Sequence, residues 1–176
     1  MVEALLALIS QGDLRPTAAR VAQRAGVSLR SVFQHFDDME TLLAAAGARQ
    51  VERIEAFLQP LPSEGPLVLR IRALVDQRAR VLEFVTPVRR AAVLLEPFSP
   101  ALQESRDLML RRARVELQTV FGPELSARAA ADRREVVAAL DAATTWAAWD
   151  HLRDRQGLNV AAAKRVITRA ITSLLS

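Results

Sequence analysis

Apolar residues recur every three to four positions along most of the chain, which is the spacing of one face of an α-helix. The first such stripe holds Val2, Leu5, Leu6 and Ile9. Similar stripes follow and predict an all-α fold of about nine helices. The expected ranges are 2–11, 18–25, 29–36, a segment that starts after Asp37 or Asp38, 66–85, 88–96, 101–121, 131–155 and 160–175.

Residues that start, stop or bend helices separate these stripes. Thr17 and Ser28 stand where an N-cap accepts a backbone N–H of the next turn. Gly26 lies between two short helices and predicts a tight corner, since glycine tolerates positive φ. Thr86-Pro87 is expected to end a helix, because the residue before proline avoids the helical region. Gly157 is expected to end the helix of residues 131–155.

The one concentrated Pro/Gly/Ser stretch, residues 59–66, predicts a break in organisation after the first four helices. We expect an N-terminal helix-turn-helix module in residues 1–46. Residues 47–176 are then a C-terminal helical bundle for ligand binding and dimerisation. Ala, Leu, Arg and Glu, all good helix formers, dominate the composition and agree with this all-α prediction.

Composition and charge exclude several other classes of protein. Hydrophobic residues make up 51% of the chain and charged residues 25%, which is typical of a globular protein. The net charge of +4 permits a nucleic-acid partner without requiring one. The chain has no cysteine, no uncharged apolar run long enough for a membrane span, and no basic leader before its first helix. We therefore expect a cytoplasmic protein with no membrane partner.

The two helices predicted over 18–25 and 29–36 suit a helix-turn-helix unit, whose second helix enters the major groove of DNA. Such a unit needs a small residue where the helices cross, a turn, and apolar anchors on the second helix. Ala22 and Gly26 meet the first two needs, while Val27 and Val32, with Leu29 and Phe36, are expected to anchor the second helix.

This arrangement leaves Arg30, Ser31, Gln34 and His35 on the face of the second helix that points away from the core. Arginine can pair with guanine O6 and N7, and glutamine with adenine N6 and N7. Ser28, at the start of the helix, can accept a phosphate beside backbone N–H groups. The pattern therefore predicts recognition of double-stranded DNA.

Residues 15–43, RPTAARVAQRAGVSLRSVFQHFDDMETLL, resemble the DNA-binding signature of the TetR family of transcriptional regulators. The similar positions are Thr17, Val21-Ala22, Ala25-Gly26-Val27-Ser28, Phe33 and His35-Phe36, followed by an acidic residue and a leucine pair. The order of about nine helices also agrees with that family. Three positions depart from its pattern: Phe33 stands where tyrosine is usual, Met39 where a phosphate-binding lysine is frequent, and Arg30 where a small residue is commoner.

The resemblance implies a role for each matching residue. Thr17, Ser28 and His35 would contact phosphates. Arg30, Ser31 and Gln34 would face base edges. Phe33 would pack against the DNA backbone or a thymine methyl group.

The last two predicted helices are apolar almost all round, which indicates burial on both sides. Paired with their symmetry mates they would form a four-helix dimer interface, as the resemblance also implies. The candidate interface residues are Trp146, Trp149, Ile167, Ile171 and Leu174. For the two tryptophans, packing in the interface and packing in the core both remain open.

Two arginines interrupt apolar stripes, Arg78 in the range 66–85 and Arg106 in the range 101–121. A charge on such a stripe is costly unless it is paired. Either arginine could meet an anionic or carbonyl-bearing ligand, or form a structural ion pair. The candidate ligand-binding residues are Arg78, Arg106, Met109, Thr144 and His151.

These features predict a dimeric, sequence-specific DNA-binding regulator, in particular a repressor that a small-molecule effector releases from a palindromic operator. The alternative is a helical dimeric interaction protein that has lost its DNA-reading face and has no effector. An enzyme is not expected, because the chain has two histidines, no cysteine and no phosphate-binding glycine loop. Glu96 and Glu116 are expected to be solvated carboxylates on helices. No cofactor or metal is expected.

Overall fold

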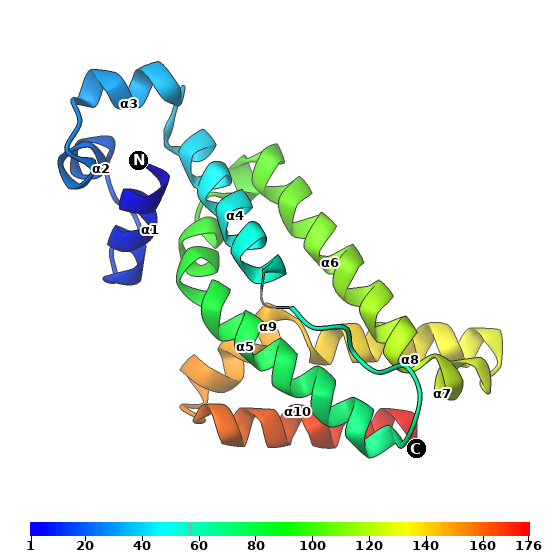
Figure 1. Cartoon of the computed structure of the whole chain (residues 1–176). Helices are drawn as coiled ribbons and strands as arrows, with labels where there is room; N and C mark the ends of the chain where they lie inside the picture. Colours follow the sequence, from blue (N-terminus) through cyan, green and yellow to red (C-terminus); the bar gives the residue numbers. More distant parts are fainter. Residues whose placement is uncertain (57) are drawn as a thin grey trace. The chain divides into compact units, whose positions relative to one another are not determined.

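The computed structural model describes residues 1–56 and 58–176, and these residues form ten α-helices without a β-strand (Figure 1). The α-helices are α1 (Val2–Ser10), α2 (Ala18–Ala25), α3 (Leu29–His35), α4 (Met39–Glu55), α5 (Leu67–Val93), α6 (Pro100–Val120), α7 (Gly122–Ser126), α8 (Ala130–Ala143), α9 (Trp146–Asp150) and α10 (Val160–Leu175). A 3-10 helix, η1 (Glu96–Phe98), follows α5, and a π-helical turn, η2 (His151–Arg155), follows α9. The all-α prediction is confirmed.

Side-chain caps fix the starts of the first helices as the sequence predicts. The Thr17 hydroxyl accepts the N–H of Arg20 at 3.3 Å, and the Ser28 hydroxyl accepts the N–H of Ser31 at 3.0 Å. Of the two aspartates before α4, Asp38 is the cap, because its carboxylate accepts the N–H of Thr41 at 2.7 Å. That hydrogen bond lowers the pKa of Asp38 below its ordinary value.

Helix α5 does not end at Thr86-Pro87, and residues 88–93 of the separate helix predicted over 88–96 are part of it. Proline removes one backbone hydrogen bond of the helix and usually breaks or kinks it. Here the residues beyond Pro87 remain helical, because Val88, Ala91 and Ala92 are buried in a hydrophobic core that stabilises this part of the helix. Tertiary packing therefore overrides the local signal.

The helix predicted over 131–155 is interrupted in its middle. Helix α8 ends at Ala143, and the hydroxyl of the buried Thr144 donates a hydrogen bond to the carbonyl of Leu140 at 2.9 Å. Thr145 then caps α9 by accepting the N–H of Ala148 at 3.2 Å. The two threonines thus make a break that the apolar periodicity conceals.

The chain packs into two units. Unit 1 contains residues 1–56 and 84–107, so it extends beyond the predicted module of residues 1–46, whose boundary stays a prediction. Its core joins α1 to α4 with the end of α5 and the start of α6. The buried residues of this core include Leu5, Ile9, Val21, Val32, Leu42, Ala46, Val88, Ala91 and Leu102.

Unit 2 contains residues 58–83 and 108–176 and has a core of its own. This core joins the first part of α5 with the end of α6 and with the helices that follow. Its buried residues include Leu74, Leu117, Phe121, Leu140, Trp149, Ile167 and Ile171. Within the described ranges, no helix has both the length and the apolar content to cross a bilayer.

Candidate nucleic-acid interface

Gly26 makes the turn between α2 and α3. Its φ of 67° places it in the left-handed region, where a side chain would strain the backbone. Its N–H donates to the carbonyl of Gln23 at 3.3 Å, and the N–H of Val27 donates to the carbonyl of Ala22 at 3.0 Å. These bonds satisfy the last carbonyls of α2 and turn the chain directly into α3. The predicted corner is confirmed.

One residue anchors α3 firmly in unit 1. Val32 is 1% exposed, and Phe36 is half-buried against the same core. Two predicted anchors are wrong: Val27 is 38% exposed and Leu29 is 46% exposed. The physical reason for Leu29 is helical geometry, because at about 100° per residue it lies nearer to Phe33 than to Val32 around the axis.

The polar residues of α3 lie on the outer surface as the sequence predicts. Arg30, Gln34 and His35 are exposed, and Ser31 is half-buried. The hydroxyls of Ser28 and Ser31 lie 3.0 Å apart and share a hydrogen bond. Thr17 is exposed at the start of α2. The roles predicted for these side chains on DNA stay predictions.

The segment of residues 14–36 has no acidic residue and contains four arginines. Arg20 pairs with Asp13 at 2.5 Å, just outside this segment. Arg15, Arg24 and Arg30 form no ion pair with any residue that the structure describes. The nearest acidic residues in the sequence, Asp13 and Asp37, stand just outside the two ends of this segment. The surface around α3 is therefore cationic.

Acidic residues outside this segment are held by other arginines. The carboxylate of Glu3, on α1, accepts hydrogen bonds from Arg49 at 3.3 Å and Arg53 at 2.6 Å, both on α4. The bond from Arg53 is the main cause that lowers the pKa of Glu3. Arg49 also pairs with Glu52 at 2.8 Å. Arg49 is thus occupied within the protein, whereas Arg30 is not.

The candidate ligand-binding arginines both have carboxylate partners. In unit 2, Arg78 pairs with Glu116 at 2.6 Å. In unit 1, Arg106 pairs with Glu96 at 2.5 Å and with Asp107 at 2.8 Å. The prediction that Glu96 is solvated is wrong, because this residue is only 8% exposed. Its carboxylate accepts hydrogen bonds from two guanidiniums, those of Arg106 at 2.5 Å and Arg89 at 2.8 Å.

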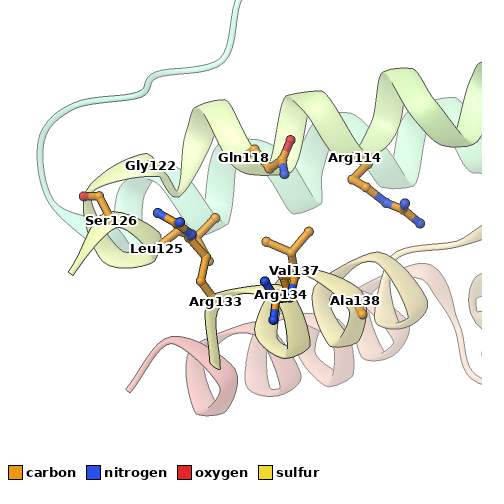
Figure 2. A pocket seen from close by; sticks show the side chains of 9 residues that line it. All are labelled: Arg114, Gln118, Gly122, Leu125, Ser126, Arg133, Arg134, Val137 and Ala138. Carbon is orange, nitrogen blue, oxygen red and sulfur yellow. The ribbon is translucent and has the colours of Figure 1, made fainter. Parts of the chain in front are cut away.

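The other three candidate ligand-binding residues do not share one site. Met109 is half-buried on α6, Thr144 is buried with its hydroxyl bonded to backbone, and His151 is exposed on η2. None of them lines the cavity that unit 2 does contain. This cavity, of about 700 Å³, lies between α6, α7 and α8 (Figure 2). Its lining residues are Arg114, Gln118, Gly122, Leu125, Ser126, Arg133, Arg134, Val137 and Ala138.

The cavity combines an apolar floor with guanidinium groups. Leu125 and Val137 are buried beneath it. Arg114 is neutralised by Asp141, with Nη2 and Oδ2 2.6 Å apart. Arg133 and Arg134, on α8, form no ion pair within the described part of the chain. The site thus offers positive charge beside apolar surface, a feature that no spacing of residues in the sequence indicates.

Three of the five candidate interface residues belong to the core of their own subunit. Trp149 is 1% exposed and donates its indole N–H to Oε1 of Glu83 at 2.7 Å. Ile167 and Ile171 are also buried in unit 2, because α5 and α8 of the same chain contribute to the core around them. For Trp149 this is the core packing that the sequence leaves open as one of two alternatives, and for Ile167 and Ile171 a place in a dimer interface stays a prediction. Trp146 and Leu174 are half-buried at the edge of the same core.

Comparison with known proteins supports the assignment of the N-terminal segment as a helix-turn-helix unit. The sequence model of the family described as "Bacterial regulatory proteins, tetR family" matches residues 2–46. The chain is also 32% identical, over 84 residues, to the HTH-type transcriptional repressor KstR of Rhodococcus jostii (strain RHA1). That match covers 47% of this chain and 39% of the repressor.

Two solved structures share the fold over nearly the whole chain. A transcriptional regulator from Rhodococcus sp. Rha1 superposes with a TM-score of 0.76 at 23% identity, over 99% of this chain and 93% of that one. A protein of Streptomyces coelicolor A3(2), described as a candidate transcriptional regulator, has a TM-score of 0.64 at 26% identity, over 97% and 95% of the two chains. None of these relatives is named as an enzyme. The chain spans less than half the length of the curated relative KstR, and its helix-turn-helix segment is similar to the tetR family of bacterial regulatory proteins.

Proposed function

We propose that this protein is a repressor of transcription that binds a specific sequence of double-stranded DNA. One observation carries the proposal: α3 presents Arg30 and Gln34 to solvent from a surface of 23 residues, 14–36, without an acidic side chain. Folding alone does not require a group of exposed polar side chains on one short helix such as α3. A second helix of a helix-turn-helix unit with this surface suits the major groove. The protein would act on the chromosome and therefore be located in the cytoplasm.

The chemistry of each side chain supports a division of roles. Arg30 can form two hydrogen bonds with guanine, and Gln34 can do so with adenine, which discriminates between bases. Thr17, Ser28 and His35 would contact phosphates, which position the protein without selecting a sequence. Ser31 lies between these groups and would contact a base edge or a phosphate.

The proposal includes a homodimer, because a helix of seven residues reaches few base pairs and two copies would recognise a palindrome. The exposed sides of α8 and α10 support this role. Val166 is 44% exposed on α10, and Ala138 and Ala142 are exposed on α8. Trp146 and Leu174, both half-buried, would contribute their solvent-exposed parts to such an interface.

The proposal also includes a small-molecule effector, with the cavity of unit 2 as its site. Arg133 and Arg134 would bind an anionic group, and Leu125 and Val137 would contact an apolar part of the same molecule. Arg78 and Arg106 are less suited to this role, since each already binds a carboxylate of the chain. An effector acts only if it binds the DNA-free state and the DNA-bound state with different affinity.

Selection of binding sites from a random library of DNA duplexes tests the proposal. The expected result is a near-palindromic site, bound with an affinity that falls steeply as salt rises. An Arg30→Ala, Gln34→Ala variant is expected to lose this selectivity, while the matched exposed change Arg80→Ala on α5 keeps it. If no sequence is enriched at any salt concentration, the alternative of an interaction protein without a DNA-reading face takes precedence.

A further inference from the structure

Two large apolar side chains of α3 lie exposed among its polar ones. Leu29 is 46% exposed and Phe33 is 51% exposed. They are four residues apart, so at about 100° per residue they lie about 40° apart around the helix axis. The two side chains therefore form one apolar strip along α3, beside the strip that holds Arg30 and Gln34.

Packing within the protein does not explain why these two positions of α3 are apolar. Val32 already anchors α3, and neither Leu29 nor Phe33 belongs to the core of unit 1. A polar residue at either position would avoid the cost of exposing apolar surface to water. A partner that covers the strip would remove this cost.

The charge around the strip identifies the chemistry of that partner. Arg15, Arg24 and Arg30 belong to the same acid-free segment of residues 14–36, and their guanidiniums form no ion pair among the described residues. The partner must therefore present small apolar groups within a strongly anionic surface. The major groove of DNA does so only at thymine, whose C5 methyl group projects into the groove between the phosphates.

We propose that Leu29 selects a thymine through its C5 methyl group, beside the contact that the family resemblance implies for Phe33, so that the operator carries thymine next to the bases contacted by Arg30 and Gln34. This inference rests on the proposed function as a DNA-binding regulator. It makes Leu29 a residue that determines specificity, although its spacing in the sequence predicts a core residue. Phe33 extends the same contact by one helical turn.

Replacement of single thymines by deoxyuridine in the selected operator tests the proposal, because it removes one methyl group and leaves base pairing intact. Binding of the full chain is measured by fluorescence anisotropy at fixed salt. We expect at least one replacement in each half-site to weaken binding about three- to fivefold, the factor that burial of one methyl group supplies.

The Leu29→Ala variant shows whether this side chain is responsible. At the thymine that Leu29 contacts, this variant is expected to bind the thymine and deoxyuridine operators equally, since the contact that distinguishes them is gone, while a thymine contacted by Phe33 keeps its effect. Leu69→Ala, the same change at a 56% exposed leucine of α5, is the matched control and is expected to keep the full preference. Melting curves of both variants confirm that they fold.

The possible outcomes separate the two proposals. Equal binding of all deoxyuridine operators by the wild-type protein, at high affinity, would overturn methyl recognition and leave the proposed function intact. If Leu29→Ala keeps the wild-type preference at every thymine of the half-site, the role of Leu29 is overturned. A library selection that yields no operator would overturn both proposals together.

Discussion

The guanidinium of Arg70 holds the carboxylate of Glu124 in a two-pronged ion pair that joins α5 to α7 within unit 2. One prong, from Nη1 to Oε2, measures 2.8 Å, and the other joins Nη2 to Oε1. The same guanidinium donates to the carbonyls of Val120 at 2.6 Å and Gly65 at 3.1 Å. The Arg70 side chain is only 4% exposed, so nearly all of its hydrogen-bonding capacity is used inside the protein.

Substitution of Arg70 by alanine is expected to destabilise the protein strongly. The change leaves the Glu124 carboxylate and the Val120 carbonyl without their donor, and breaking a buried ion pair of this kind costs about 3–5 kcal/mol. Urea denaturation measures the loss in the free energy of unfolding. Arg72→Ala removes an 80% exposed arginine of the same helix and is expected to cost less than about 1 kcal/mol. Equal losses would contradict this account of Arg70.

The same ion pair predicts a dependence of stability on pH. The hydrogen bond from Arg70 lowers the pKa of Glu124 below its ordinary value. The unfolded chain therefore takes up the proton at a higher pH than the folded one, so the stabilisation is complete above the unfolded pKa, near pH 4.3, and is lost as the pH falls through the folded pKa. We expect the stability difference between wild type and Glu124→Gln to shrink in acid. Glu104→Gln, at an exposed carboxylate of α6, is the control.

Replacement of glycine by alanine is expected to change the stability of the protein in opposite directions at Gly26 and at Gly47. Gly26→Ala places a Cβ at a φ of 67° and is expected to cost about 1–2 kcal/mol. Gly47 lies inside α4, with no atom within 4 Å of the place of its Cβ, so Gly47→Ala is expected to add about 0.5–1 kcal/mol. Thermal melts compare the two variants. A destabilising Gly47→Ala would show that the helix interior is less tolerant than its geometry indicates.

Arg30 and Ser28 are expected to affect DNA binding in different ways. Arg30→Ala should weaken the preferred operator by about 1–3 kcal/mol and relax the base preference at one position of each half-site. Ser28→Ala removes a phosphate contact and the cap of α3, so it should weaken all sequences alike and lower stability by about 1 kcal/mol. Binding to the operator and to a scrambled duplex distinguishes the two. The reverse pattern would refute the assigned roles.

Val166 tests the proposed dimer. It is exposed on α10, so Val166→Glu leaves the core of unit 2 intact while it places a charge where a second copy would pack. We expect a shift from dimer to monomer in analytical ultracentrifugation, with loss of operator binding. Val68→Glu, at a 69% exposed valine of α5, is expected to leave the dimer unchanged. A wild-type protein that is monomeric at all concentrations would exclude this part of the proposal.

The sequence predicts local structure well where one side chain decides it. Thr17, Ser28 and Asp38 start their helices as expected, because a cap needs only a hydroxyl or carboxylate near the first N–H groups. Gly26 makes its turn for a similar reason. Pro87 fails as a stop signal, since burial of Val88 and its neighbours outweighs the missing hydrogen bond.

Predictions about sites fail where they depend on what covers a side chain. The stripe of α10 is apolar whether a second copy or the same subunit covers it, and the structure buries Ile167 and Ile171 within the subunit. Arg78 and Glu116 lie 38 positions apart, so their pairing is invisible in the local pattern. The prediction for Leu29 fails for a different reason, because around the axis of α3 this residue lies nearer to the exposed Phe33 than to the buried Val32.

The residues that make up the core of unit 1 limit how its proposed DNA-binding surface can be used apart from the rest of the chain. Val88, Ala91 and Leu102 form one wall of the core beneath α1 to α4, although they lie at least 42 positions beyond residue 46. A polypeptide cut at residue 46 lacks this wall and would leave Leu42 and Leu43 in water, where such surfaces promote aggregation. Transplanting the recognition helix to another protein therefore requires the chain through residue 107, or an engineered replacement for the missing apolar wall.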